Sequence, residues 1–369
     1  MNEHASTGGA AARPTNPRAA AGVVVAGVAV ALAFMPATPG PAKRPGRGAV
    51  ASSSPDRGTG RDGTVTLVDD GSGANTGPQP GLPPVTKLTA GQKPPQFVVF
   101  SFDGALEDDS HSLSQVRALG KANNAKVTFF LRGLDLLPVE KRSLYRPPQH
   151  DPGTAAIPFP TDEQVKATLG QLGQAWLVGD EIASGLNGQF CGAKGAPDWS
   201  SDDWANEIDQ AYSLVRFWKT DTGFTELPPV PFDYQSELAG GRAPCRPAQP
   251  ALLAAEQQFG WRYDASGSAN VGADSWPVQA DGIWQFPVRQ RQSEQDYLAA
   301  FEHAYGGNRA PLLVDTDPRA GDGADQVRVA GDVMRTVCRR DGVRCVSLRE
   351  LADWLDGQDP AVLERLRRS

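Results

Sequence analysis

"VVFSFDGALEDD" (residues 98–109) joins an apolar run to a carboxylate and an acidic loop. The run begins at Phe97, is interrupted only by Ser101, and ends at Phe102, directly before Asp103. Such a run is typical of a parallel strand that is buried on both faces. Because function in α/β barrels lies at the carboxyl ends of the strands, the sequence predicts that Asp103 belongs to a functional site or is the remnant of one.

Further short apolar runs alternate with helical patterns from this strand onward. In the pattern over 201–220, Trp204, Ile208 and Val215 fall on one face, as expected for an amphipathic helix. This alternation predicts an α/β fold, a distorted (β/α)7-type barrel, with an open doubly wound sheet as the structural alternative. The expected strands are 97–102, 126–131, 181–183, 310–314 and 345–347.

The N-terminal part differs in composition from the rest. Residues 1–38 contain the uncharged apolar stretch Ala19–Met35 behind two arginines, which predicts a signal peptide or an N-terminal membrane anchor. Residues 39–95 are rich in Pro, Gly and Ser and are expected to be a disordered linker, because they hold too few apolar side chains to offset the entropy of ordering. The barrel would then occupy 96–357, followed by a C-terminal tail at 358–369.

The net charge and the cysteine content of the chain limit the partners and the cellular compartment that can be expected for it. The net charge of −7, without a basic stripe in the folded region, argues against a nucleic acid partner. The four cysteines show no C-x-x-C spacing and the four histidines are scattered, so a zinc cluster is not expected. An even number of cysteines in an exported chain favours disulfides, and Cys338 with Cys345 is the easiest local closure. We therefore expect a secreted or membrane-anchored, extracytoplasmic protein, in contact with the membrane if its N-terminal segment is retained.

Six segments of the chain form a recognisable series, in the order FVVFSFDGA, KVTFFLRG, GDEIASGLNGQF, GGRAPC, GWRYDASGS and APLLVDTD. Together they resemble the NodB-homology polysaccharide deacetylases, carbohydrate esterase family four, over about residues 96–356. The resemblance implies a distorted barrel in which a divalent metal polarises an N-acetyl carbonyl and activates a water. Polysaccharide of the cell wall or the extracellular space would be the partner.

The family's metal-binding motifs are altered in this chain. Its T-F-D-D motif corresponds to residues 101–104, so the resemblance assigns the general base to Asp103 and puts Gly104 where a metal ligand belongs. Its H-x-x-x-H motif corresponds to 185–189, with Gly185 and Gln189 in place of both histidines. Glycine has no donor atom and a neutral amide is a poor zinc ligand, so no cofactor is expected.

The remaining motifs supply further candidate residues. Arg242 stands in an intact R-x-P motif and would orient the base, Asp264 is a candidate acid, and Asp317 stands near the position of a missing acid histidine. The motifs around Cys191 and Cys245 converge on one mouth in this fold, which predicts a disulfide between them. The candidate substrate-binding residues are Trp276, Trp284 and Asn187.

These features lead to one main hypothesis and two alternatives. The main hypothesis is a catalytically degenerate, deacetylase-like protein of the cell envelope that acts through binding. The first alternative is an active hydrolase of N-acetylated polysaccharide that uses a divalent metal, Zn²⁺, Mn²⁺ or Mg²⁺. Its rebuilt site would consist of Asp103, Asp315 and Asp317, a set of carboxylates that can hold Mg²⁺, Mn²⁺ or Ca²⁺. Two of these carboxylates could also act without a metal, as acid and base on a glycosidic bond. The second is a structural surface protein that uses the barrel only as a scaffold.

Overall fold

β3 (Gln96–Asp103) is the strand around which the sheet is built. It pairs in parallel with β10 (Leu312–Thr316) at one edge, and with β11 (Val343–Val346) and β4 (Val127–Leu131) along successive halves of the other. The expected strand 97–102 is thus confirmed and extended by one residue at each end. The computed structural model describes residues 65–89, 91–245, 250–267, 274–286 and 292–368.

From β4 the sheet continues in parallel through four more strands and ends in an antiparallel one. The expected α/β architecture of parallel strands and covering helices is confirmed. Within the described residues the last strand, β8, does not pair with β10, so the barrel is open there. These strands are β5 (Glu181–Ser184), β6 (Gly240–Gly241), β7 (Tyr263–Asp264), β9 (Ile283–Gln285) and β8 (Val278–Ala280).

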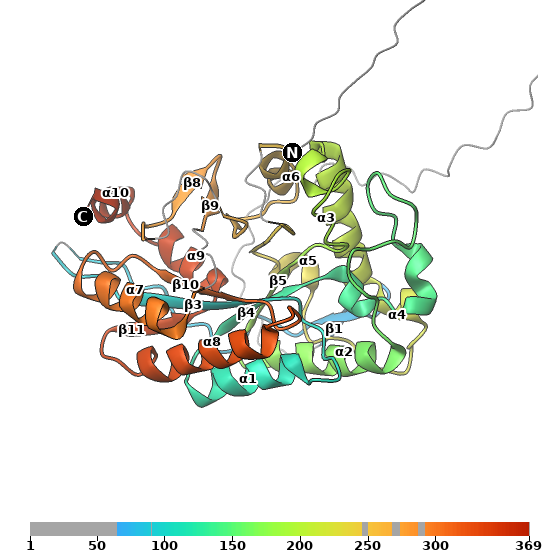
Figure 1. The fold of residues 1–369 in the computed structure, drawn as a ribbon, viewed down its shortest axis with the longest axis horizontal. Coiled ribbons are helices and arrows are strands. Elements are labelled where there is room, and N and C mark those ends of the chain that lie inside the picture. The colour runs from blue at the N-terminus through green and yellow to red at the C-terminus, as the bar shows by residue number, and fades with distance from the viewer. Residues whose placement is uncertain (1–64, 90, 246–249, 268–273, 287–291, 369) are drawn as a thin grey trace, which may run out of the picture. The chain divides into compact units, whose positions relative to one another are not determined.

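Helices cover both faces of the sheet. Figure 1 shows α1, α2 and α8 beside one another along one face, with α9 on the opposite side. The α-helices are α1 (Ser112–Ala122), α2 (Asp162–Leu177), α3 (Ser201–Arg216), α4 (Trp218–Thr222), α5 (Tyr234–Glu237), α6 (Pro250–Gln258), α7 (Glu294–Gly306), α8 (Gly323–Val337), α9 (Leu348–Asp356) and α10 (Pro360–Arg368). The shorter 3₁₀ helices are η1 (Gly133–Leu136), η2 (Val139–Leu144) and η3 (Ala196–Asp198).

Local sequence signals fix where several of these helices begin. In α2, the side chain of Thr161 accepts a hydrogen bond from the backbone N–H of Gln164, whose side chain in turn bonds the backbone of Thr161. Ser200 and Ser347 start α3 and α9 in the same reciprocal way. Such capping boxes satisfy backbone donors that would otherwise lack partners at the first turn. The helix over 201–220 predicted from the sequence is α3, interrupted before α4.

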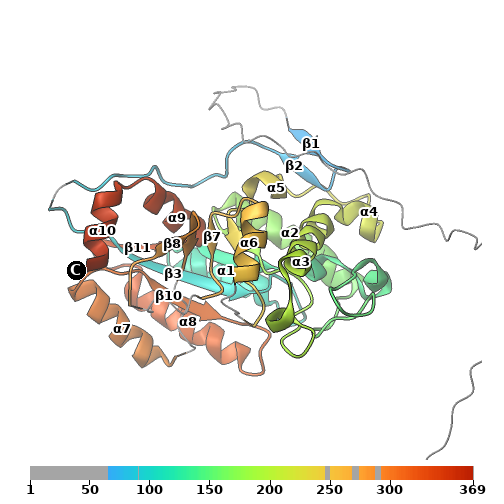
Figure 2. The same cartoon turned by 90° about the horizontal axis from the view of Figure 1, so that it is seen from above.

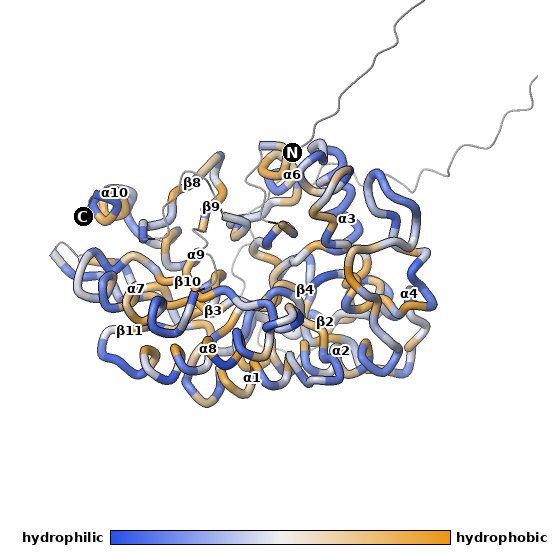
Figure 3. Tube along the Cα trace, viewed as in Figure 1, coloured by the Kyte–Doolittle hydropathy of each residue, from blue (hydrophilic) through white to orange (hydrophobic). Residues whose placement is uncertain are grey.

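The alternation of side chains along β3 supplies two hydrophobic cores, one on each face. Val98, Phe100 and Phe102 pack with α1, α2 and α8. Phe97 and Val99 pack with α9 and with residues of β7 and β9. Figure 3 shows the hydrophobic residues concentrated along the central strands. On this second face, Val99 is followed by the polar residues Ser101 and Asp103 toward the end of β3.

The second half of the expected linker is ordered and packs on the domain, which corrects the prediction for those residues. β1 (Thr66–Val68) and β2 (Gly73–Asn75) form an antiparallel hairpin beside α4 (Figure 2). The indole Nε1 of the buried Trp218 donates to the carbonyl of Ser72 at 2.9 Å, and the buried side chain of Gln79 donates to two backbone carbonyls. A few specific polar contacts thus anchor a segment whose composition is poor in apolar residues.

The predictions for the two ends of the chain have different outcomes. The expected tail at 358–369 forms α10, whose Leu363 and Leu366 are buried against the second core. The expected signal peptide or anchor at 1–38 lies outside the described residues. Among the residues that are described, no helix is both long and apolar enough to cross a membrane.

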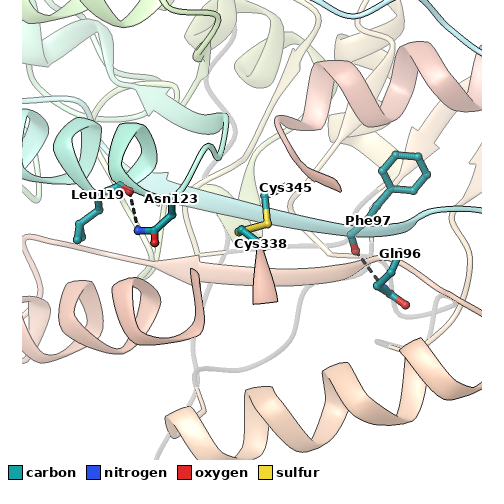
Figure 4. The surroundings of a disulfide bond; sticks show 6 residues. All are labelled: Gln96, Phe97, Leu119, Asn123, Cys338 and Cys345. Atoms are coloured by element: carbon teal, nitrogen blue, oxygen red, sulfur yellow. Dashed lines mark hydrogen bonds between the residues drawn. A yellow bond between two sulfur atoms is a disulfide. The ribbon is translucent and has the colours of Figure 1, made fainter. Parts of the chain in front are cut away.

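Both expected disulfides are present. Cys338, at the end of α8, is bonded to Cys345 of β11 (Figure 4). Cys191, in the loop after β5, is bonded to Cys245, in the loop after β6, with Cα atoms 5.4 Å apart. The second bond therefore ties together two loops at the carboxyl ends of neighbouring strands.

Candidate functional site

Asp103 and Arg242 meet at the carboxyl ends of β3 and β6. Arg242 Nη1 donates to Asp103 Oδ1 at 2.9 Å. The Arg242 side chain is 3% exposed and that of Asp103 21%, so the pair lies at the edge of the buried interior. Two glycines bring Arg242 this close. A Cβ at Gly240 or Gly241 would lie 2.2 Å or 2.5 Å from a backbone carbonyl oxygen of the neighbouring strand.

The Arg242 guanidinium also binds the neighbouring strands. Its Nη1 contacts a carboxylate oxygen of the buried Asp315 on β10, and its Nη2 donates to Ser101 Oγ at 3.0 Å. Its Nε donates to the carbonyl of Ala265 at 2.9 Å, and it stacks on the Phe130 ring with 4.1 Å to the centroid. Arginine suits this place because its planar fork can serve several acceptors at once.

Beside this pair is a small pocket of about 30 Å³. It brings together Asp103 and the three positions at which the family resemblance implies metal ligands, Gly104, Gly185 and Gln189. Its wall is completed by Arg242, the Cys245 loop, Phe130 and a further arginine, Arg132. The motifs thus converge in space as the sequence predicts, and the pocket is the candidate site.

Arg132 places a buried positive charge in this pocket, next to two of the positions where the family resemblance implies metal ligands. It follows β4, is 3% exposed, and extends its guanidinium alongside Gly104. A Cβ at Gly104 would lie 3.2 Å from Arg132 Nη1 and 3.3 Å from its Cζ. A Cβ at Gly185 would lie 3.3 Å from Arg132 Cγ. The two glycines therefore make room for the cationic side chain.

The residues of this pocket do not fit a divalent metal. Gly104 and Gly185 offer no donor atom, and a guanidinium lies directly beside Gly104. A cation at this position repels a second cation strongly in a buried environment. Among the described residues, no group of three or more His, Cys, Asp or Glu side chains is arranged to hold a metal ion.

Asp264 lies on the inner side of the same strand ends. It closes β7, is buried, and accepts a hydrogen bond from the backbone N–H of Ser266 at 2.6 Å. Burial raises the pKa of Asp264 to about 6, although the bonds from Ser266 and the charge of Arg242 oppose this rise. Such a carboxyl group titrates near neutrality, a property of acids in active sites. It does not line the pocket that contains Asp103.

Asp315, rather than Asp317, is the β10 carboxylate that reaches Arg242. Asp317 lies beyond the strand, where its Oδ1 accepts from the backbone N–H of Arg319 at 3.0 Å and its own N–H donates to Gln326. Asp315 lies within β10 and is held there by its pairing with Ser101 of β3, whereas Asp317 follows the last residue of the strand.

The three residues expected to bind substrate are buried in the structure. Trp276 and Trp284 are 2% and 3% exposed and belong to the second core. Their indole N–H groups donate to the carbonyl of Asn308 and to Asp356. Asn187 is fully buried and its amide donates to the carbonyl of Glu207 at 2.9 Å. These side chains have structural roles and present no aromatic wall to a ligand.

A buried carboxyl group holds the loop that carries Gln189. Glu207 of α3 accepts from the Tyr145 hydroxyl at 3.0 Å and from the backbone N–H of Gly188 at 3.2 Å. Burial raises the pKa of Glu207 to about 7, while the bonds from Gly188 and Tyr145 oppose the rise. The loop is thus held by a carboxyl group whose pKa is raised toward neutrality.

Comparisons with known proteins find solved structures that match this chain at low sequence identity. No family model matches the chain, and no curated protein matches it significantly. A solved structure described as a polysaccharide deacetylase from Mycobacterium smegmatis is 14% identical, with a TM-score of 0.46, over 74% of this chain and 94% of that one. A CE4 domain of a multidomain xylanase from the hindgut metagenome of Trinervitermes trinervoides is 15% identical, with a TM-score of 0.42, over 72% and 93%.

A CE4 family pseudoenzyme from Bacillus anthracis is also similar, at 10% identity and a TM-score of 0.40, over 73% of this chain and 70% of that one. The roles of the individual residues rest on the sequence and on the geometry of the pocket.

Arg132 is the residue of the pocket to which the motifs gave no role. It stands in KVTFFLRG, directly after a buried strand and before Gly133. A charged residue in that position is a signal for a group at the carboxyl end of a parallel strand. The packing of its side chain against Gly104 and Gly185, however, depends on the tertiary structure and cannot be recognised in the sequence.

Proposed function

We propose that this protein is a deacetylase-like pseudoenzyme that binds carbohydrate outside the cytoplasm. The observation that carries the proposal is the Arg132 guanidinium beside Gly104, in the pocket where Asp103, Gly185 and Gln189 converge. A metal-dependent deacetylase needs donor atoms at those positions. This chain instead has two glycines and a buried cation.

The chemistry of the pocket supports binding rather than hydrolysis. Deacetylation by the family's route needs a Lewis acid that polarises the acetyl carbonyl and lowers the pKa of a bound water. Asp103 could accept a proton, but an aspartate alone does not supply that activation. Its carboxylate is also held in an ion pair with Arg242.

The alternative of a rebuilt hydrolase site receives less support. It would need Asp103, Asp315 and Asp317 around one metal or one glycosidic bond. Arg242 binds the first two carboxylates, and the described contacts of Asp317 are with Arg319 and with Gln326 of α8. A guanidinium shared by two carboxylates competes with a metal for the same oxygens.

Two disulfides are typical of extracytoplasmic proteins. Secretion or anchoring through residues 1–38 belongs to this proposal, as does an envelope or extracellular polysaccharide as the partner. The resemblance to polysaccharide deacetylases points to N-acetylated glycans among the candidates.

The proposal is tested by measuring catalysis and binding on one preparation. Acetate release from chitin oligomers and peptidoglycan is followed with added Zn²⁺, Mn²⁺ or Co²⁺, and with a chelator. A glycan array is probed with the same protein. We expect binding to a subset of glycans and no acetate release above that of Asp103→Asn. Chelator-sensitive acetate release that this substitution abolishes would overturn the proposal.

A further inference from the structure

Arg132 is a buried cation whose guanidinium forms no ion pair with any residue that the structure describes. Its Nε is buried without a hydrogen-bond partner. Within the described part of the chain, its guanidinium makes no hydrogen bond or ion pair, although residue 132 is 97% shielded from solvent. A buried charge without a partner is costly, and proteins normally supply one.

The nearby carboxylates are engaged elsewhere. The described ion pair of Asp103 is with Arg242. Asp135 Oδ2 accepts hydrogen bonds from the backbone N–H groups of Arg132 and Ala105. Asp135 Oδ1 forms an ion pair with Arg319 Nη1 at 2.9 Å. Asp135 thus fixes the backbone of Arg132 without neutralising its side chain. The guanidinium is left facing the small pocket that it lines.

We infer that this pocket binds a carboxylate group of the ligand through the guanidinium of Arg132. The inference rests on the proposed function, and it makes the bound carbohydrate an acidic one, such as a glycan that carries uronate residues. The missing negative charge is then brought by the ligand.

The shape of the pocket favours a carboxylate over other anions and over a neutral acetyl group. A guanidinium presents parallel N–H donors that match the two oxygens of a carboxylate. A volume of about 30 Å³ admits one small planar group but no sugar ring. The amide of Gln189 lines the same pocket and can donate a further hydrogen bond. A neutral carbonyl would leave the charge of Arg132 uncompensated.

The site is organised before the ligand arrives. Gly104 and Gly185 leave room that a Cβ would take from the guanidinium and its stem. Preorganisation of this kind reduces the entropy that binding would otherwise cost. The same two positions that lack metal donors therefore hold the cation in place.

The test compares charged and neutral ligands on the full chain by calorimetric titration at pH 7 and low salt. The ligands are oligoglucuronate, chitin oligomers, acetate, acetamide and inorganic phosphate. The variants are Arg132→Gln, Arg132→Lys and the control Arg328→Gln, whose side chain lies 57% exposed on α8. We expect oligoglucuronate to bind the wild type and the control, and to bind Arg132→Gln about 10- to 100-fold more weakly.

A second measurement keeps the test valid if a variant folds poorly. Acetate should raise the melting temperature of the wild type and of the control, and acetamide should not. Arg132→Lys should bind acetate with intermediate affinity, because it retains the charge but not the planar fork.

The remaining outcomes separate the inference from the proposed function. Equal binding of chitin oligomers and oligoglucuronate, unchanged by Arg132→Gln, would overturn the inference and leave the proposed function standing. Acetate binding that depends on Arg132, with no glycan bound on any array, would support the pocket and overturn the proposed function. Binding of phosphate but of no carboxylate would overturn the assigned ligand class.

Discussion

Arg242 Nη1 lies 2.9 Å from Asp103 Oδ1, and the same nitrogen contacts the carboxylate of Asp315. One buried guanidinium thus joins the carboxyl ends of β3, β6 and β10. The inner face of the sheet at these strand ends carries charge instead of apolar side chains. The stability of the domain should therefore depend on this contact.

Replacing Arg242 by Ala should destabilise the fold by about 3 to 5 kcal/mol, because two carboxylates would lose a buried partner. Urea denaturation followed by circular dichroism measures this change. Arg328→Ala, on the exposed side of α8, is the control and should change the free energy of unfolding by less than about 0.5 kcal/mol. Equal midpoints for the two variants would mean that Arg242 is not held as a buried partner.

Gly104→Ala should destabilise the domain more than Gly260→Ala. Both glycines have positive φ, +88° and +70°, so alanine is strained at either position. Only at Gly104 would the new Cβ also crowd a neighbour, the Arg132 guanidinium. We expect a loss of about 1 to 2 kcal/mol at Gly260 and a larger loss at Gly104.

A double-mutant cycle isolates that crowding. In an Arg132→Ala background the cost of Gly104→Ala should fall to the value measured at Gly260, since only the backbone strain remains. An unchanged cost would show that the guanidinium does not lie against Gly104.

Removing the two disulfides should cost different amounts. The Cys191–Cys245 bond spans a sequence separation of 54 and the Cys338–Cys345 bond one of 7. Loop-closure entropy predicts losses of about 4 and about 2.5 kcal/mol for the respective double Ser variants. Denaturant midpoints of the two variants give the comparison, and a larger loss for Cys338→Ser/Cys345→Ser would contradict it.

The stability of the domain should fall as the pH rises from about 4.5 to just above 7, in part because of Glu207. Burial raises its pKa in the folded state from 4.5 to about 7, so folding favours the protonated form. The stabilisation is complete below pH 4.5 and is lost as the pH rises through 7, to a total of about 3 kcal/mol.

Glu207→Gln, which stays neutral, should flatten that dependence. The free energy of unfolding measured at pH 5 and at pH 8 should differ less in the variant than in the wild type. The other buried carboxyl groups are the same in both proteins, so the comparison reports on Glu207. Parallel pH profiles would mean that this carboxyl group does not titrate with a raised pKa.

The sequence predicts the strands that are long enough to show a pattern. β3 is recognisable because a continuous apolar run ends in Asp103, and Arg242 because an intact motif surrounds it. β6 and β7 have only two residues each, which is too short for any periodic signal. The cluster of Arg132 with Gly104 and Gly185 was not predictable, since it depends on how three loops approach one another.

Burial explains the other differences from the sequence-based predictions. Trp276 and Trp284 were candidates for an aromatic wall because they lie near strand ends, but a tryptophan in an α/β core has the same sequence context. The hairpin of β1 and β2 lies in a segment whose composition indicates disorder, yet Ser72 and Gln79 bind buried groups of the domain. A prediction of disorder from composition depends on the number of apolar residues in a segment, and it cannot take single buried hydrogen bonds into account.

Restoring metal ligands should produce zinc binding only when Arg132 is removed as well. Gly104→Asp with Gln189→His adds two donors beside Asp103, but the guanidinium remains in the pocket and repels the metal. Gly185 stays unchanged, because a Cβ there would lie 2.5 Å from the carbonyl oxygen of Phe130. Adding Arg132→Ala should raise zinc affinity by more than about tenfold, whereas adding Arg328→Ala should not. Calorimetric titration with Zn²⁺ measures both, and tight binding by the variant that keeps Arg132 would show that its charge does not exclude the metal.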